Sequence, residues 1–202
     1  MRAAVIRGNS RKLADLIRKD PGFDVNSQDG EGATLLHHAC VYGKDSVIPL
    51  LLAHPDIDAN LKESRGWTPF WTACFRGHTS CVRLLLKDFR VKVNKANNDV
   101  WTPLWFAAAN GHVDVIRWWI ASGRDLDLGK PGDVDKTDAI GAAKEEGKTE
   151  VVNLLERFKG DAAKTRSEVR LELGITGESV HPAHLSSFPF FFFFLFFCIC
   201  GI

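Results

Sequence analysis

The chain has no excess of charge of either sign. Among its 202 residues, 26 Lys and Arg stand against 25 Asp and Glu, so the formal net charge is +1 at pH 7. Nucleic-acid-binding domains usually concentrate positive charge, because they must neutralise phosphates. This balance therefore argues against a nucleic-acid partner. The composition, 45% hydrophobic and 25% charged, is that of an ordinary globular protein and excludes a disordered chain.

Cysteines are few, and no pattern among them indicates a disulfide scaffold or a zinc site. The five are Cys40, Cys74, Cys81, Cys198 and Cys200. Their number is odd, only the last two lie close together, and no C-x-x-C pair combines with His at the spacing of structural zinc. We therefore expect no metal site, and we expect a reducing, cytoplasmic location. The N-terminus also lacks the apolar core and cleavage site of a secretory signal.

No apolar run reaches the roughly 20 residues that a membrane-spanning helix needs. The closest candidate is the uncharged run 190–202, which falls short of that length and lies within the Phe-rich tail 188–202. Three interpretations compete: a C-terminal membrane anchor, an aggregation-prone end of a real protein, and a mistaken gene model, because the codons of Phe, Leu, Ser, Cys and Ile are thymine-rich. We favour the last, and we expect membrane contact only if this tail is genuine.

Motifs of catalysis and cofactor binding are equally scarce. Gly147-Lys148-Thr149 has the ending of a phosphate-binding loop, but that motif needs Gly where Ala142 stands, and it needs a preceding strand. The histidines offer no hydrolase constellation. We therefore expect no catalytic residue, no cofactor and no enzyme activity.

What the sequence does contain is an internal repeat. Segments 32–60, 66–94 and 100–128 align without gaps, and the step from each segment to the next is the same. A fixed period of this size is the signature of a repeat architecture. The positions that recur with this period are Thr34, Thr68 and Thr102; Gly43, Gly77 and Gly111; and Asn26, Asn60 and Asn94.

The repeated residues predict a pair of helices in each unit. Thr followed by Pro69 or Pro103 suits a helix start, because the hydroxyl caps free N–H groups and Pro at the first helical position loses no hydrogen bond. The recurring Gly ends this short helix with a left-handed turn. A second helix with an apolar stripe follows, and the Asn-rich segments are turns between units. Pro49 falls inside a second helix and predicts a kink or a late helix start there.

This pattern resembles the ankyrin family, whose repeat is a β-turn and two antiparallel helices with a T-P-L-H-x-A signature. The segments TPFWTA (68–73) and TPLWFA (102–107) match the signature except at the His, which is Trp71 and Trp105 here. The resemblance implies an all-α ankyrin-repeat α-solenoid with short β-turn or hairpin links. It also implies that the corner before Thr-Pro borders a concave face used for partners.

We predict an ankyrin-repeat domain over residues 1–160. Its five units cover about 1–28, 29–62, 63–96, 97–131 and 132–160, and the first and last are caps. The charged surface of the last unit suits a cap, because no further unit stacks on it. Residues 161–187 are expected to be a short helix and a linker, with the helix favoured over a strand. Residues 188–202 are the hydrophobic tail of doubtful origin.

Aromatic residues form the candidate binding site. Trp and Arg are enriched at binding hot spots, because a large amphipathic side chain can be desolvated as one rigid piece. The alternative is that the rings only fill the space between units, and polar hairpin tips such as Arg65 and Asn97 are candidates for a rim. All six tryptophans lie in two adjacent units: Trp67, Trp71, Trp101, Trp105, Trp118 and Trp119. We predict as partner-binding residues Trp67, Trp71, Phe75, Arg76, Trp101, Trp105, Phe106 and Asn110, with Trp71 and Trp105 half buried.

The sequence therefore favours a monomeric scaffold that binds a protein partner through an aromatic-rich concave face. Two alternatives stay open: a regulatory ankyrin segment of a larger enzyme or channel, and an adaptor anchored to a membrane by its C-terminus. The identity of the partner is not encoded in the repeat, because the scaffold is shared while specificity lies in variable surface side chains.

Overall fold

The computed structural model describes residues 1–129 and 137–175. Within these residues the chain is helical and contains no strand, which confirms the all-α prediction. The linker from residue 176 and the Phe-rich tail 188–202 lie outside the described residues. The elements are α1 (Arg2–Ile6), α2 (Ser10–Lys19), α3 (Leu35–Val41), the 3-10 turn η1 (Asp45–Val47), α4 (Ile48–Leu52), α5 (Pro69–Arg76), α6 (Thr79–Lys87), α7 (Pro103–Ala109), α8 (Val113–Ser122), α9 (Ala139–Glu145), α10 (Thr149–Gly160) and α11 (Ala162–Glu172).

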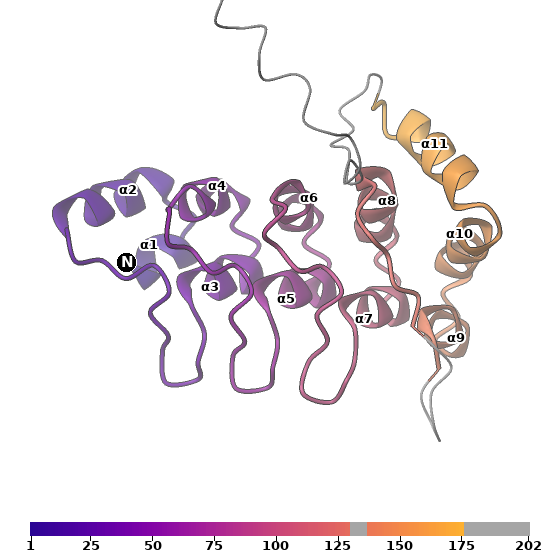
Figure 1. Ribbon diagram of the computed structural model, residues 1–202, viewed down its shortest axis with the longest axis horizontal. Helices are drawn as coiled ribbons and strands as arrows, with labels where there is room; N and C mark the ends of the chain where they lie inside the picture. Colours follow the sequence, from indigo (N-terminus) through magenta and orange to yellow (C-terminus); the bar gives the residue numbers. More distant parts are fainter. Residues whose placement is uncertain (130–136, 176–202) are drawn as a thin grey trace, which may run out of the picture.

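The helices form two rows (Figure 1). The inner row contains α1, α3, α5, α7 and α9, each packed against the next, and the outer row contains the second helix of each pair. The links between the first four pairs descend from the outer row and form loops below the inner row before the next pair begins. We number the five pairs as units one to five.

The inner helices of units two to five begin at the residue that the repeat predicts. The hydroxyls of Thr34, Thr68 and Thr102 accept hydrogen bonds from the backbone N–H three residues later. In unit five the carboxylate of Asp138 does the same for Gly141. Loss of such a cap typically costs about 1 kcal/mol of stability. The helix starts predicted from Thr and Pro are therefore confirmed.

The recurring glycines meet two demands at once. Gly43, Gly77 and Gly111 have φ of 62°, 69° and 74°, the left-handed conformation that the sequence predicts. A Cβ atom on Gly43 would also lie 2.8 Å from the ring of His78, and one on Gly77 would lie 2.6 Å from His112. At Gly43 and Gly77, close approach between units therefore disfavours a side chain independently of the backbone angle.

The recurring asparagines connect one link to the next. The side chain of Asn26 donates to the Asp56 carbonyl and accepts from the Asp58 N–H. Asn60 does the same with Arg90 and Lys92. These residues are therefore bridges between units as well as turn formers.

Pro49 delays the outer helix of unit two, as predicted. A 3-10 turn occupies Asp45–Val47, and α4 begins only at Ile48, with Pro49 in its first turn. The equivalent helix of unit three, α6, begins at Thr79, the position that corresponds to Asp45 in the alignment of the repeats. Proline is tolerated in the first turn of a helix because its missing N–H has no partner there.

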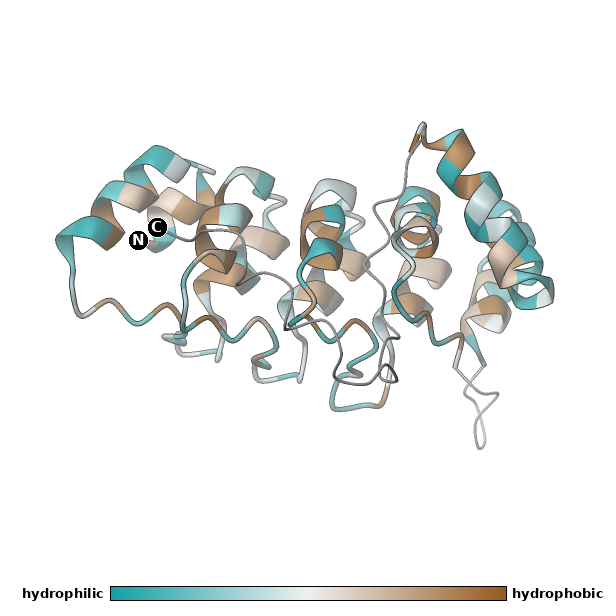
Figure 2. Ribbon diagram, turned by 45° about the horizontal axis from the view of Figure 1, so that its top comes forward, coloured by the Kyte–Doolittle hydropathy of each residue, from teal (hydrophilic) through white to brown (hydrophobic). Residues whose placement is uncertain are grey.

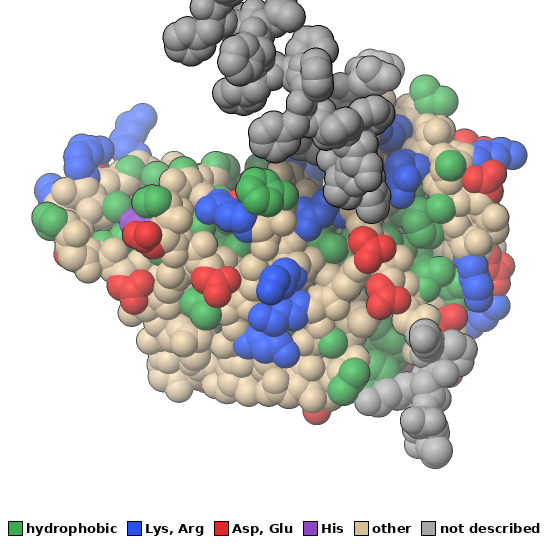
Figure 3. Space-filling view, in the orientation of Figure 1, with side chains coloured by type: hydrophobic (Ala, Val, Ile, Leu, Met, Phe, Trp, Pro, Cys, Tyr) green, Lys and Arg blue, Asp and Glu red, His purple; other side chains and the backbone are tan. Residues whose placement is uncertain are grey.

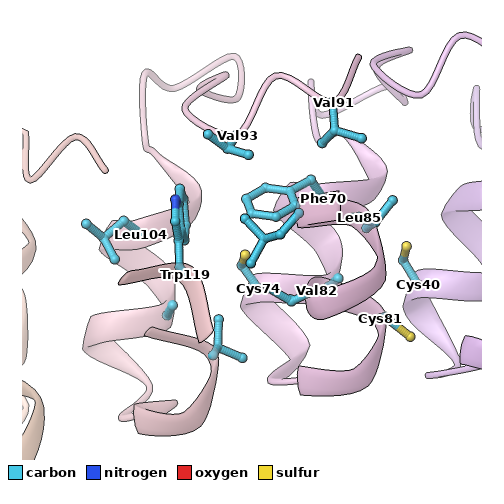
Figure 4. Close-up of a cluster of buried hydrophobic side chains, with 14 of the residues drawn as sticks. Cys40, Phe70, Cys74, Cys81, Val82, Leu85, Val91, Val93, Leu104 and Trp119 are labelled. Atoms are coloured by element: carbon cyan, nitrogen blue, oxygen red, sulfur yellow. The ribbon is translucent and has the colours of Figure 1, made fainter. Parts of the chain in front are cut away.

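The core runs continuously between the two rows. Phe70 of α5 meets Trp119 of α8 edge to face, with ring centroids 4.9 Å apart (Figure 4). Leu85 and Leu104 lie beside this pair and are fully buried. Hydrophobic stretches are concentrated in the central helices, whereas α2 near the N-terminus is largely hydrophilic (Figure 2). Each unit therefore buries its apolar face against its neighbours.

The chain continues after unit five as a helix, which confirms the preference for a helix over a strand. Helix α11 packs against both α10 and α8 and buries Val169 completely. The Arg166 guanidinium donates to the Ile120 carbonyl at the end of α8, and Arg157 pairs with Glu168. Among residues 1–129 and 137–175, no helix has both the length and the apolar character that crossing a membrane requires.

Candidate functional site

Six aromatic rings of units three and four form one contiguous cluster, the aromatic ridge. Ring centroids are 4.4 Å apart for Trp67 and Trp71, 4.8 Å for Trp71 and Phe106, and 4.3 Å for Trp101 and Trp105. Since Phe106 touches rings of both units, it joins the two halves. The ridge consists of Trp67, Trp71, Phe75, Trp101, Trp105 and Phe106.

The ridge has a buried base and exposed edges. Trp71 is fully buried at 0% exposure, so the prediction that it is half buried is wrong. Its ring is covered by Trp67, Phe75 and Phe106, with centroids 4.4 to 5.5 Å away. Trp105 is partly buried, as predicted. Trp71 therefore supports the surface from beneath and presents no face to a partner.

Trp71 and Trp105 replace the motif histidine in function as well as in position. In unit two, His37 accepts the Thr34 N–H at Nδ1 and donates from Nε2 to the Trp67 carbonyl of the next unit. The indole N–H of Trp71 donates to the Trp101 carbonyl, and that of Trp105 donates to the Thr137 carbonyl. Either ring carries an N–H at its edge, so either ring can bridge adjacent units.

Two of the six tryptophans do not belong to the ridge. Trp119 is buried in the core, where its indole N–H donates to the Asp125 carbonyl. Trp118 lies partly exposed on α8 in the outer row, beneath the guanidinium of Arg83. The six tryptophans are therefore not one patch, although they lie in adjacent units.

The remaining candidate residues stand at the margin of the ridge. Trp67, Phe75, Trp101 and Phe106 are partly exposed. Arg76, the last residue of α5, is exposed, with its guanidinium carbon 5.6 Å from the Phe75 ring. Asn110, at the end of α7, is exposed but donates its amide to the Phe106 carbonyl. The structure thus brings the predicted residues together, except that Trp71 is covered.

Hairpin-tip residues divide into structural and exposed ones. Asn97 is buried, and its side-chain oxygen accepts the N–H groups of Asp99 and Trp101. Glu63 does the same for Arg65 and Trp67 in the preceding loop. Arg65 is exposed, and its guanidinium carbon lies 3.7 Å from the Trp67 ring centroid. Sequence reasoning placed Arg65 only on a rim, because nothing in the repeat indicates that it stacks on the ridge.

The electrostatics around the ridge are mixed. On the face shown in Figure 3, groups of basic and of acidic side chains lie among one another. Burial raises the pKa of the thiols of Cys40 and Cys74 well above the usual range and that of Cys81 to about 12. Thiols that are buried and protonated are poor nucleophiles.

In the described residues, no three His, Cys, Asp or Glu side chains gather as a metal site would require.

The sequence pattern can be compared with known families. The family model described as ankyrin repeats, in three copies, matches residues 1–97 and 46–130. No curated protein matches the chain. Ankyrin repeats generally mediate contacts between proteins. These matches cover more than half of the chain and the helix pairs stack as repeats of this kind do, so the protein belongs to the ankyrin-repeat family.

Proposed function

We propose that this protein is a cytoplasmic, monomeric scaffold that holds a partner protein against the exposed edges of the aromatic ridge. The observation that carries the proposal is the arrangement of six rings across two units, five of them partly exposed over a fully buried Trp71. A solvent-exposed cluster of this kind is unnecessary for stacking, since unit two forms the same inter-unit bridge with a single histidine.

Rigidity supports the proposal as well. Trp71 is fixed by its hydrogen bond to the Trp101 carbonyl and by the rings packed on it. The exposed rings therefore rest on a base that does not need to be ordered on binding, which reduces the entropic cost of association. The buried free thiols of Cys40, Cys74 and Cys81 are in keeping with a reducing compartment.

The proposal requires no catalysis, and the ridge contains aromatic rings rather than nucleophiles or acid–base pairs. If the chain serves instead as the regulatory ankyrin segment of a larger enzyme or channel, the same surface would hold its target. Both versions therefore make the same prediction about the ridge.

Substitution of exposed ridge residues tests the proposal. We expect Trp101→Ala combined with Phe75→Ala to reduce capture of the partner from a cell lysate at least tenfold, because hot-spot residues each contribute roughly 2 kcal/mol or more. Capture is measured by quantitative mass spectrometry at matched bait concentration. Trp118→Ala is the matched control, since Trp118 is also partly exposed but lies on the outer row.

Far-ultraviolet circular dichroism and urea unfolding show whether the variants remain folded. If folded ridge variants capture the same partners as the parent, the rings serve only to fill space between units and the proposal is wrong.

A further inference from the structure

Two basic side chains stand at the margin of the aromatic ridge, and both belong to unit three. Arg65 lies at the Trp67 end of this unit and Arg76 at its Phe75 end. The neighbouring loops carry acidic residues instead, Glu31 in unit two and Asp99 in unit four. The ridge therefore joins a region over unit three that carries two basic side chains to an aromatic region over unit four whose loop carries Asp99.

Arg65 is held in place before any partner binds. Its guanidinium stacks on one face of the Trp67 ring at 3.7 Å, while Trp71 lies 4.4 Å from Trp67 and nearly parallel to it. The Arg65 Nε lies 3.4 Å from Oε2 of Glu63, whose other oxygen accepts two backbone N–H groups. Within the described residues, the two terminal nitrogens of Arg65 make no hydrogen bond or ion pair, and they can donate together to one carboxylate.

Arg76 provides a second basic group at a suitable distance. It is exposed and pairs with no carboxylate among the residues that the structure describes. The distances from Arg65 to the Trp67 ring, from Trp67 to Phe75, and from Phe75 to Arg76 are 3.7, 5.5 and 5.6 Å, so the two guanidinium carbons are at most about 15 Å apart. An extended segment rises about 3.3 Å per residue, so side chains two or four residues apart on one face span about 7 or 13 Å.

From this arrangement we infer that the ridge binds an extended acidic segment of a partner protein. Two Asp or Glu residues, two or four positions apart, pair with Arg65 and Arg76, and a neighbouring apolar side chain packs on Phe106 and Trp101. The inference rests on the proposed function and adds the chemistry of the partner. A carboxylate that reaches Arg65 keeps the cation on Trp67, so the stacked pair is not broken on binding.

A library of random 12-residue peptides displayed on phage, selected against the full chain, tests this inference. We expect the enriched peptides to contain Asp or Glu at positions two or four apart beside an aromatic or branched apolar residue. Affinities of fluorescently labelled peptides are then measured by anisotropy at low and at raised salt. Arg65→Gln with Arg76→Gln should weaken binding at least tenfold, and raised salt should weaken parent binding more than variant binding.

Arg83→Gln is the matched control. Its guanidinium also stacks on a tryptophan, Trp118, but it lies on the outer row and should leave the affinity unchanged. Replacing the acidic residues of the peptide by Asn or Gln should weaken binding to the parent and have little effect on the double variant, because the two changes remove the same interaction.

The outcomes separate this inference from the proposed function. Enriched peptides without acidic residues, or equal affinity for parent and double variant, would overturn the inference. If such peptides still lost affinity for Phe75→Ala, the proposed function would stand. If no peptide is enriched over a control selection that lacks the protein, the inference is also overturned. The proposed function would then still be decided by the capture of the intact partner from a lysate.

Discussion

Val100 has a backbone conformation that β-branched residues rarely adopt. Its φ is +67°, and the equivalent positions in the two preceding units are Gly32 and Gly66, with φ of +78° and +80°. Val100 is 69% exposed, so packing gives it little compensation. A non-glycine residue in this region costs on the order of 1–3 kcal/mol. The turn of unit four is therefore strained next to Trp101.

Val100→Gly should stabilise the protein by about 1 kcal/mol, since the relief of strain exceeds the added entropy of a glycine in the unfolded chain. Urea unfolding followed by circular dichroism measures the change. Val100→Ala is the control, because alanine removes most of the side chain but keeps the Cβ that causes the strain. Equal stability of the Gly and Ala variants would contradict this explanation.

His37 links the stability of the stack to pH. Burial lowers the pKa of His37 below its ordinary value of 6.5, against the hydrogen bond to Trp67, which raises it. The unfolded chain therefore takes up a proton at a higher pH than the folded one does. The stability that neutral His37 contributes is present above pH 6.5 and is lost as pH falls through the lower folded pKa.

His37→Gln should be less stable than the parent at pH 7, by about 1 kcal/mol for the lost bridge to unit three. It should also lose less stability than the parent between pH 7 and pH 5, because glutamine does not titrate. Urea unfolding at both pH values gives the comparison, and groups common to both proteins cancel in the difference. An identical loss in both would show that His37 does not titrate on unfolding.

At the scale of elements, α11 covers apolar surface of the outer row. Besides Val169, Thr165 is its only buried residue, so the contact depends on few side chains. Its polar contacts include the hydrogen bond from Arg166 to the Ile120 carbonyl and the ion pairs Arg157–Glu168 and Arg117–Glu172. Helix α11 thus packs on α8 and α10 together.

Val169→Ala should destabilise the protein by about 2 kcal/mol, from two lost methyl groups and the cavity that they leave. Leu171→Ala, in the same helix but 70% exposed, should change stability by less than about 0.5 kcal/mol. Hydrogen exchange should show faster opening of α11 in the first variant only. Equal effects of the two substitutions would mean that α11 is not docked through Val169.

At the scale of the whole molecule, the stack is a series of contacts between neighbours. Each inner helix packs on the next, and each link is bonded to the next through an asparagine or an arginine. Stability in such a structure is approximately a sum over units and their interfaces. A binding surface can therefore vary in two adjacent units without disturbing the others, as the ridge does in units three and four.

Much of this protein could be predicted from its sequence. The repeat period, the Thr caps, the left-handed glycines and the displaced helix start at Pro49 depend on local backbone chemistry, which a sequence records directly. The ridge tryptophans were identified as well, because they stand at equivalent positions in consecutive units, and Phe75 and Phe106 were identified because they follow on the same short helices. The valine at a glycine position is also visible in the alignment, although its strain follows only from the backbone angle.

The tertiary structure alone decided which of these residues face solvent and which bridge units. Trp71 is buried while Trp105 is partly exposed, although both occupy the same repeat position, because the rings that cover Trp71 come from its own unit and from Phe106 of the next. The stacking of Arg65 on Trp67 and the bonds from both indoles to the following unit likewise depend on side-chain packing. A repeat period specifies where backbones lie, whereas burial depends on the size and orientation of side chains that come from different units of the chain.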